Sequence, residues 1–170
     1  MWVLRHIHDL ASSCAVADLG AIESAALFHD AVYDPRSTTN EPDSAALAVG
    51  VLTRAGWSSE RVSVVRELIM CTAHHPGRGH PALSIDQQVL VDADLSILGS
   101  SPAEYTTYAT AVRAEFAHVT DRDWTAGRSS FLRGVLAEPT IFHTDAMRSG
   151  REQRARANIG AELAMLSTAV

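Results

Sequence analysis

Apolar residues recur every three or four positions along most of this chain, and the strict alternation of a β-strand is nowhere sustained. A repeat near 3.6 residues is the pattern of an amphipathic helix. Pro, Gly and capping residues divide the chain into eight expected helices, at about residues 2–16, 21–33, 41–55, 59–72, 85–99, 102–119, 121–137 and 144–167. The pattern therefore predicts an all-α fold.

Capping residues mark several of the expected helix starts. Asn40 stands before Glu41 as an N-cap, and Ser84 followed by Gln87 has the spacing of a capping box. Ser101 and Glu104 have the same spacing at the start of the next expected helix. The clearest loop is the segment 74–81, which is rich in His, Gly and Pro.

One apolar run ends in the adjacent pair His29 and Asp30. The spacing of Ile22, Ala26, His29 and Tyr33 continues the apolar face of a helix, so His29 is expected to point inward. An ionised pair on an inward face is costly unless its charge is compensated. A divalent metal is one compensation, and a buried ion pair or a capped core histidine is another. The pattern leaves these readings open.

Two further expected helices carry an inward polar residue. Asp94 follows Leu90 by four positions and lies in an apolar stripe, whereas Asp92 is expected to turn away from it. His6 lies four residues from Trp2 on the first helix. Taken singly, each has a structural reading. Together they offer imidazole and carboxylate from three helices, which suits Mn, Fe, Co, Ni or Zn.

Composition removes several classes of function. The chain is 46% hydrophobic and 20% charged, which is ordinary for one globular domain. All 14 basic residues are Arg, so lysine chemistry is excluded. A net charge of -6 without a basic tail predicts no nucleic-acid partner.

Location is predicted from what the sequence does not carry. No apolar run approaches the roughly 20 residues that span a bilayer. The start has no signal-peptide layout, and Cys14 and Cys71 have no CxxC partner. We therefore expect a cytoplasmic protein with no membrane partner.

The ordered set of candidate residues resembles the HD superfamily of metal-dependent phosphohydrolases. The likeness rests on Leu-Arg-His6-Ile, Phe-His29-Asp30-Ala, Asn40-Glu41 and Asp92-Ala-Asp94-Leu, with further matches over nearly the whole chain. It is similar to a bacterial branch described as predicted HD phosphohydrolases. The resemblance implies a compact helical bundle of about eight helices over residues 1–170, without the family's usual N-terminal segment.

The resemblance also implies the roles of individual residues. The metal ligands implied for one divalent ion (Mn, Fe, Co, Ni, Zn or Mg) are His6, His29, Asp30 and Asp94. Asp34 and Glu41 take catalytic positions, although Tyr33 stands where other branches have Glu. The residues expected to contact substrate are Asn40, His74 and His75. Helix capping remains an equal reading for Asn40 and Glu41.

Further matches to this branch have structural readings. Tyr105 and Tyr108 are expected in the core rather than against a substrate. Arg128 matches the branch, but it belongs equally well to a structural hydrogen-bond network.

Three functions follow from the resemblance and its alternatives. The first is hydrolysis of a small phosphate ester or nucleotide by a metal-activated water. The second is an HD-type di-iron oxygenase, which needs further ligands from His74, His75 and His80. The third is a non-catalytic module that binds metal or nucleotide. The expected partner is a small phosphorylated substrate, and homodimerisation is left open.

Overall fold

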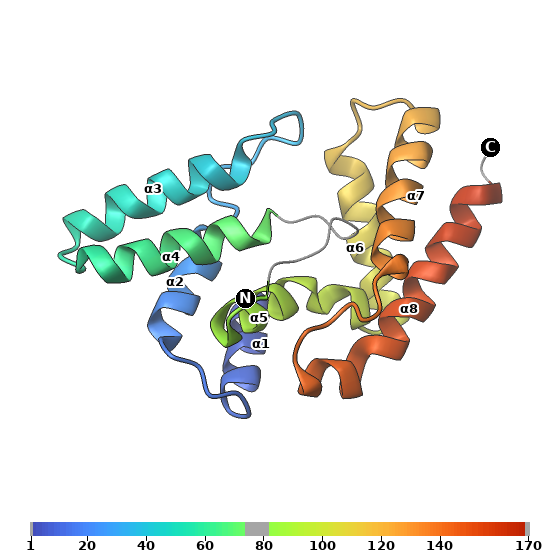
Figure 1. The fold of residues 1–170 in the computed structure, drawn as a ribbon. Helices are drawn as coiled ribbons and strands as arrows, with labels where there is room; N and C mark the ends of the chain where they lie inside the picture. The colour runs from blue at the N-terminus through green and yellow to red at the C-terminus, as the bar shows by residue number, and fades with distance from the viewer. Residues whose placement is uncertain (1, 74–81, 169–170) are drawn as a thin grey trace. The chain divides into compact units, whose positions relative to one another are not determined.

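The computed structural model describes residues 2–73 and 82–168, and these residues form eight α-helices, one 3-10 helix and no β-strand (Figure 1). The prediction of an all-α fold with about eight helices is confirmed. The described chain separates into two units, one of residues 2–73 and 82–94 and one of residues 95–168. The expectation of a single domain stays a prediction.

The first unit holds α1 (Trp2–Ala11), α2 (Leu19–Phe28), α3 (Asn40–Arg54), α4 (Ser59–Thr72) and α5 (Ile85–Asp94). Helices α3 and α4 run side by side as an antiparallel pair (Figure 1). Helix α2 packs on α4 and α5, and α1 packs on α5. The centre of this unit is formed by fully buried side chains: Ile7, Ile22, Ala48, Val65, Ile69 and Leu90.

The second unit holds the 3-10 helix η1 (Leu95–Gly99), α6 (Pro102–Glu115), α7 (Asp121–Ala137) and α8 (Asp145–Thr168). Helix α8 packs on α7 and on η1. Leu132, Phe142 and Ile159 are among the fully buried side chains here. None of the helices within 2–73 and 82–168 is long and apolar enough to cross a membrane.

The predicted capping boxes are both present. Ser84 N–H donates to Gln87 Oε1 and Gln87 N–H donates to Ser84 Oγ. Ser101 and Glu104 make the same reciprocal bonds at the start of α6. The expected N-cap at Asn40 is wrong by one residue, because Thr39 is the N-cap and Asn40 begins α3.

The first expected helix ends early, at Ala11 rather than near residue 16. The hydroxyls of Ser12 and Ser13 donate back to the carbonyls of Asp9 and Leu10. Such local bonds compete with the bonds that continue a helix. The hydrophobic pattern alone does not show this competition.

The second expected helix ends at Phe28, so His29 is its C-cap and Asp30 lies in the following turn. His29 Nδ1 lies 3.0 Å from the carbonyl oxygen of Ala26. In a continued helix that carbonyl would accept the N–H of Asp30. The imidazole therefore replaces a backbone N–H as the partner of the Ala26 carbonyl. Tyr33 lies outside the helix and is 50% exposed. The prediction that Tyr33 continues the apolar face is wrong.

Candidate metal centre

His29 is held by the end of α2 with one ring nitrogen committed to the backbone. Its Nδ1 donates to the Ala26 carbonyl at 3.0 Å, and the residue is 9% exposed. A hydrogen bond at one ring nitrogen fixes the tautomer and the ring plane, and leaves the other nitrogen for a partner. The nitrogen that His29 presents is Nε2.

Two carboxylates meet this nitrogen. Asp30 Oδ2 lies 3.2 Å from His29 Nε2, and Asp94 Oδ1, at the last residue of α5, lies 3.3 Å from it. The side chains of Asp30 and Asp94 are 64% and 35% exposed, so the cluster is open to solvent on its acidic side. Residues distant in sequence are thus joined at one imidazole, within the first unit.

The cluster carries more negative than positive charge. Burial disfavours the imidazolium, but the hydrogen bonds that it donates to Asp30 and Asp94 outweigh this effect and raise the pKa of His29 to about 10. The hydrogen bond from His29 lowers the pKa of Asp30. With His29 protonated and both carboxylates ionised, two negative charges share one positive charge. A further cation would be attracted to this position.

The donor set fits part of a divalent-metal site. Two atoms that bind one ion at about 2.0–2.2 Å and about 90–100° lie about 2.9–3.3 Å apart. The Nε2 to carboxylate distances of 3.2 and 3.3 Å match this separation. As the side chains stand, however, no three or more His, Cys, Asp or Glu residues within 2–73 and 82–168 are arranged to hold an ion. The carboxylates close on the imidazole as ion pairs instead.

Asp94 lies against His29, and its role as a metal ligand stays a prediction. Asp92 is completely buried, whereas Asp94 is only partly covered. The α-helical register stops at Asp94, and Leu95 begins a 3-10 helix, so positions beyond 94 do not continue the assumed stripe. The prediction that Asp92 turns away from the core is therefore wrong.

His6 is buried on α1, at 5% exposure. Its ring meets Trp2 edge-on at a centroid distance of 5.0 Å, and its Nδ1 lies 3.8 Å from Asp9 Oδ2. Helix α1 packs against α2 and α5, the two helices that supply the cluster. The role of His6 as a fourth ligand stays a prediction.

The side chain of Asn40 holds the turn that follows Asp30. Its Oδ1 accepts the N–H of Asp34 at 3.0 Å, and its Nδ2 donates to the Asp34 carbonyl at 2.9 Å. Both polar groups of the Asn40 amide are thus engaged by the backbone. This arrangement gives Asn40 a positioning role, and its predicted contact with substrate stays a prediction.

The two predicted catalytic carboxylates are Asp34, whose backbone Asn40 binds, and Glu41, which follows Asn40 in the chain. Asp34 is exposed, and its Oδ1 accepts the N–H of Arg36 at 2.9 Å. Glu41 lies in the first turn of α3 and is partly buried. A carboxylate there is stabilised by the positive end of the helix dipole. Their catalytic roles stay predictions, and His74 and His75 lie outside the described residues.

Ser44 supports the same turn and was not identified as a site residue. It is fully buried on α3, where its Oγ accepts the Val32 N–H at 3.0 Å and donates to the Val32 carbonyl at 3.2 Å. Ser44 follows Asn40 by four residues, so the two lie on one face of α3. That spacing is the signal that would have found it.

Cys71 is a second residue that the sequence reasoning passed over. Burial, and then the negative charge of Asp94, raise the pKa of the Cys71 thiol to about 12. Its Sγ–H donates to the Leu68 carbonyl at 3.0 Å. The side chain is thus a neutral thiol beside the cluster, and no disulfide joins it to Cys14.

No protein-family model, curated protein or solved structure matches the chain.

Proposed function

We propose that this chain is a metal-dependent phosphohydrolase that acts on a small phosphate ester or nucleotide. The observation that carries the proposal is the convergence of Asp30 and Asp94 on the Nε2 of a histidine whose Nδ1 is already fixed. Fixed imidazole with exposed carboxylate is the chemistry of a divalent-metal ligand set. The order of these residues in the chain, with its resemblance to the HD superfamily, supports the same function.

The residues of the cluster have separate tasks in this proposal. His29 is held rigidly by the Ala26 carbonyl, while Asp30 and Asp94 supply negative charge from the turn and from α5. Metal binding requires His29 to give up the proton at Nε2, because a ligating imidazole is neutral. A divalent ion supplies Lewis-acid polarisation of a phosphoryl oxygen and a water of lowered pKa.

The turn after Asp30 supplies the remaining groups. Asn40 and Ser44 hold its backbone, so that Asp34 is presented at the surface. The Asp34 carboxylate then moves a proton to or from the reacting oxygens, with Glu41 nearby in the chain as the second acidic group. A positioned carboxylate contributes about 10²–10⁴-fold to such a reaction.

A non-catalytic module is the alternative that one observation favours. As the side chains stand, both carboxylates pair with His29, and the part of the chain covered by the structure contains no preassembled metal group. In that case His29, Asp30 and Asp94 tie the end of α2 to α5. Metal content separates this alternative from the proposal.

The test is elemental analysis of purified wild-type protein and of Asp30→Ala after equilibration with Mn, Co, Ni or Mg. We expect about one ion per wild-type chain and none in Asp30→Ala, because the substitution removes an anionic ligand. Asp145→Ala is the matched control, since Asp145 is an exposed aspartate of the second unit. Equal metal in wild type and Asp30→Ala would show that the cluster is structural.

Turnover is measured separately on nucleotides and sugar phosphates with each metal added. Release of phosphate by the wild type but not by Asp30→Ala supports the proposed reaction. If the protein binds one metal ion per chain but releases phosphate from none of these substrates, the hydrolase proposal is rejected and a metal-binding module is the remaining interpretation.

A further inference from the structure

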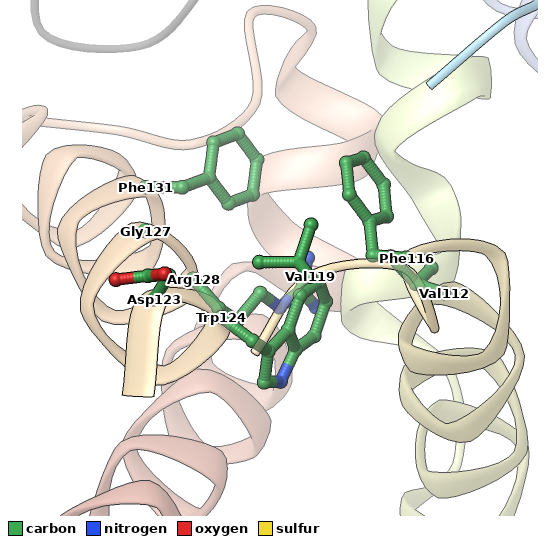
Figure 2. Close-up of a pocket in the computed structure, with 8 residues that line it drawn as sticks. All are labelled: Val112, Phe116, Val119, Asp123, Trp124, Gly127, Arg128 and Phe131. Carbon is green, nitrogen blue, oxygen red and sulfur yellow. The ribbon is translucent and has the colours of Figure 1, made fainter. Parts of the chain in front are cut away.

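The second unit contains an apolar pocket of about 410 Å³ between the end of α6, the turn after it and α7. Figure 2 shows the Phe116 and Phe131 rings projecting to the same side, with Val119 between them and Trp124 below. Val112 and Gly127 complete the apolar lining. None of these residues belongs to the His29 cluster.

The size and the lining of the pocket suit a small organic molecule. Ligand pockets are typically about 300–1,000 Å³, and a cavity of about 150 Å³ holds one benzene ring. A pocket of about 410 Å³ therefore has room for one or two rings with a short substituent. Aromatic side chains supply large apolar area and favour ring stacking or edge contacts.

The charges around the pocket argue for an uncharged occupant. Arg128 reaches the pocket lining, but its Nε and Nη2 bind Glu162 at 2.7 and 3.1 Å, so its charge is already neutralised. Asp123 is exposed, and its Oδ2 accepts the Thr120 hydroxyl at the start of α7. A charged group placed among the Phe and Val side chains would lose hydration, and the two charged residues of the lining, Asp123 and Arg128, already have partners in Thr120 and Glu162.

Gly127 keeps one wall of this pocket open. A Cβ atom built at this position would meet nothing within 4 Å. A larger side chain would therefore enter empty space instead of disturbing a packed neighbour. Position 127 is the place from which the pocket can be narrowed with little effect on the helices.

We propose that this pocket binds a small uncharged molecule that carries an aromatic or alicyclic ring. The ring lies among Phe116, Trp124 and Phe131, and Gly127 leaves room for its edge. This proposal does not depend on the proposed hydrolase centre, whose described residues belong to the first unit.

The test is an NMR titration of the full chain that follows the indole N–H signals of its three tryptophans. The probes are 2-phenylethanol, 2-phenylethylamine and 3-phenylpropionate, which share a ring and differ in charge. We expect the neutral alcohol to shift the Trp124 signal, and to bind about tenfold more tightly than either ion. The Trp2 and Trp57 signals should stay in place.

Gly127→Leu should weaken binding of the alcohol by at least about tenfold, because the added side chain occupies the pocket. Val119→Phe narrows the opposite wall and serves as a second variant should Gly127→Leu fold poorly. The matched control is Ala114→Leu, which narrows a neighbouring hollow that Trp124 also lines. That control should bind the alcohol like the wild type.

Several results would overturn the proposal. One is equal or tighter binding of either charged probe. Another is loss of the Trp124 shift in Ala114→Leu but not in Gly127→Leu or Val119→Phe, which would move the ligand to the neighbouring hollow. A dimer that Gly127→Leu dissociates would make the pocket an interface between two copies.

Discussion

Two clusters of charged side chains, one in each unit of this protein, are built differently. In the first unit His29 meets Asp30 and Asp94, whose side chains are 64% and 35% exposed. In the second unit Arg128 meets Glu162, and their side chains are 6% and 7% exposed. The first cluster opens to water, and the second is closed.

The second cluster satisfies its own charges. Arg128 binds both oxygens of Glu162, and the Tyr105 hydroxyl donates to Glu162 Oε2 at 2.5 Å. The guanidinium also lies 5.6 Å from the centre of the Tyr108 ring. A buried network of this kind rigidifies the fold and leaves no charge for a ligand.

The first cluster keeps carboxylate oxygens available. Two acidic side chains share one imidazolium, and their exposed surface leaves acceptor positions that water or a cation can occupy. The difference teaches that burial and charge balance together, and not the presence of an ion pair, separate a structural cluster from a candidate binding centre.

The largest expected effect comes from opening the closed cluster. Glu162→Gln keeps the shape of the side chain but leaves the Arg128 charge buried without a counter-charge. We expect the free energy of unfolding to fall by about 3–5 kcal/mol, measured by equilibrium urea denaturation. The double variant Arg128→Met/Glu162→Leu should recover most of this loss. A fall below about 1 kcal/mol would show that the network does little for stability.

The next effect contrasts two aspartates on α5. Asp92 is fully buried, so Asp92→Asn should reduce the free energy of unfolding by about 1–3 kcal/mol while the protein still binds metal. Asp94→Asn should do the reverse, with little loss of stability and complete loss of the ion. Urea denaturation of metal-free protein and elemental analysis measure the two quantities. Metal loss in Asp92→Asn but not in Asp94→Asn would show that Asp92, and not Asp94, is the metal ligand.

The helices and their capping boxes were predictable because they rest on contacts close in sequence. Ser84 with Gln87 and Ser101 with Glu104 each lie three residues apart. The expected burial is confirmed for Tyr105, at 4% exposure, whereas Tyr108 is only half-buried. Local spacing is enough for these features, and no knowledge of the tertiary fold is needed.

The side-chain partners within the two clusters were harder to predict from the sequence. Glu162 is 34 residues from Arg128, and no local pattern marks them as partners. Asp92 is also buried against expectation, and Ser96, four residues further along the chain, is buried with it. The His29 turn was hidden because its ring, and not a backbone N–H, occupies the Ala26 carbonyl.

The smallest expected effect concerns the ion pair between Arg61 and Asp18. It is bidentate, like the Arg128–Glu162 pair, but partly exposed, like the His29 cluster. Arg61 Nε and Nη2 bind the two oxygens of Asp18 at 2.6 and 2.8 Å, and the side chains are 41% and 31% exposed. Gly20 permits this approach, since a Cβ there would lie 2.5 Å from Arg61 Nη2. Solvent screening weakens such pairs.

Asp18→Asn retains a capping side chain for α2 and removes the charge that pairs with Arg61, so it isolates the ion pair. The hydrogen bond from Arg61 lowers the pKa of Asp18 below its ordinary 3.8. The pair therefore contributes fully above about pH 4 and loses its contribution as the pH falls through the lowered pKa. We expect a stability deficit at pH 7 of less than about a third of the Glu162→Gln effect, which disappears near pH 2. Urea midpoints at pH 7, 5, 3 and 2 measure it, and Gly20→Ala should show the same pH dependence. If the loss of stability in Asp18→Asn persists unchanged at pH 2, it comes from the weakened helix cap. The exposed ion pair would then contribute nothing measurable to stability, unlike the buried Arg128–Glu162 pair.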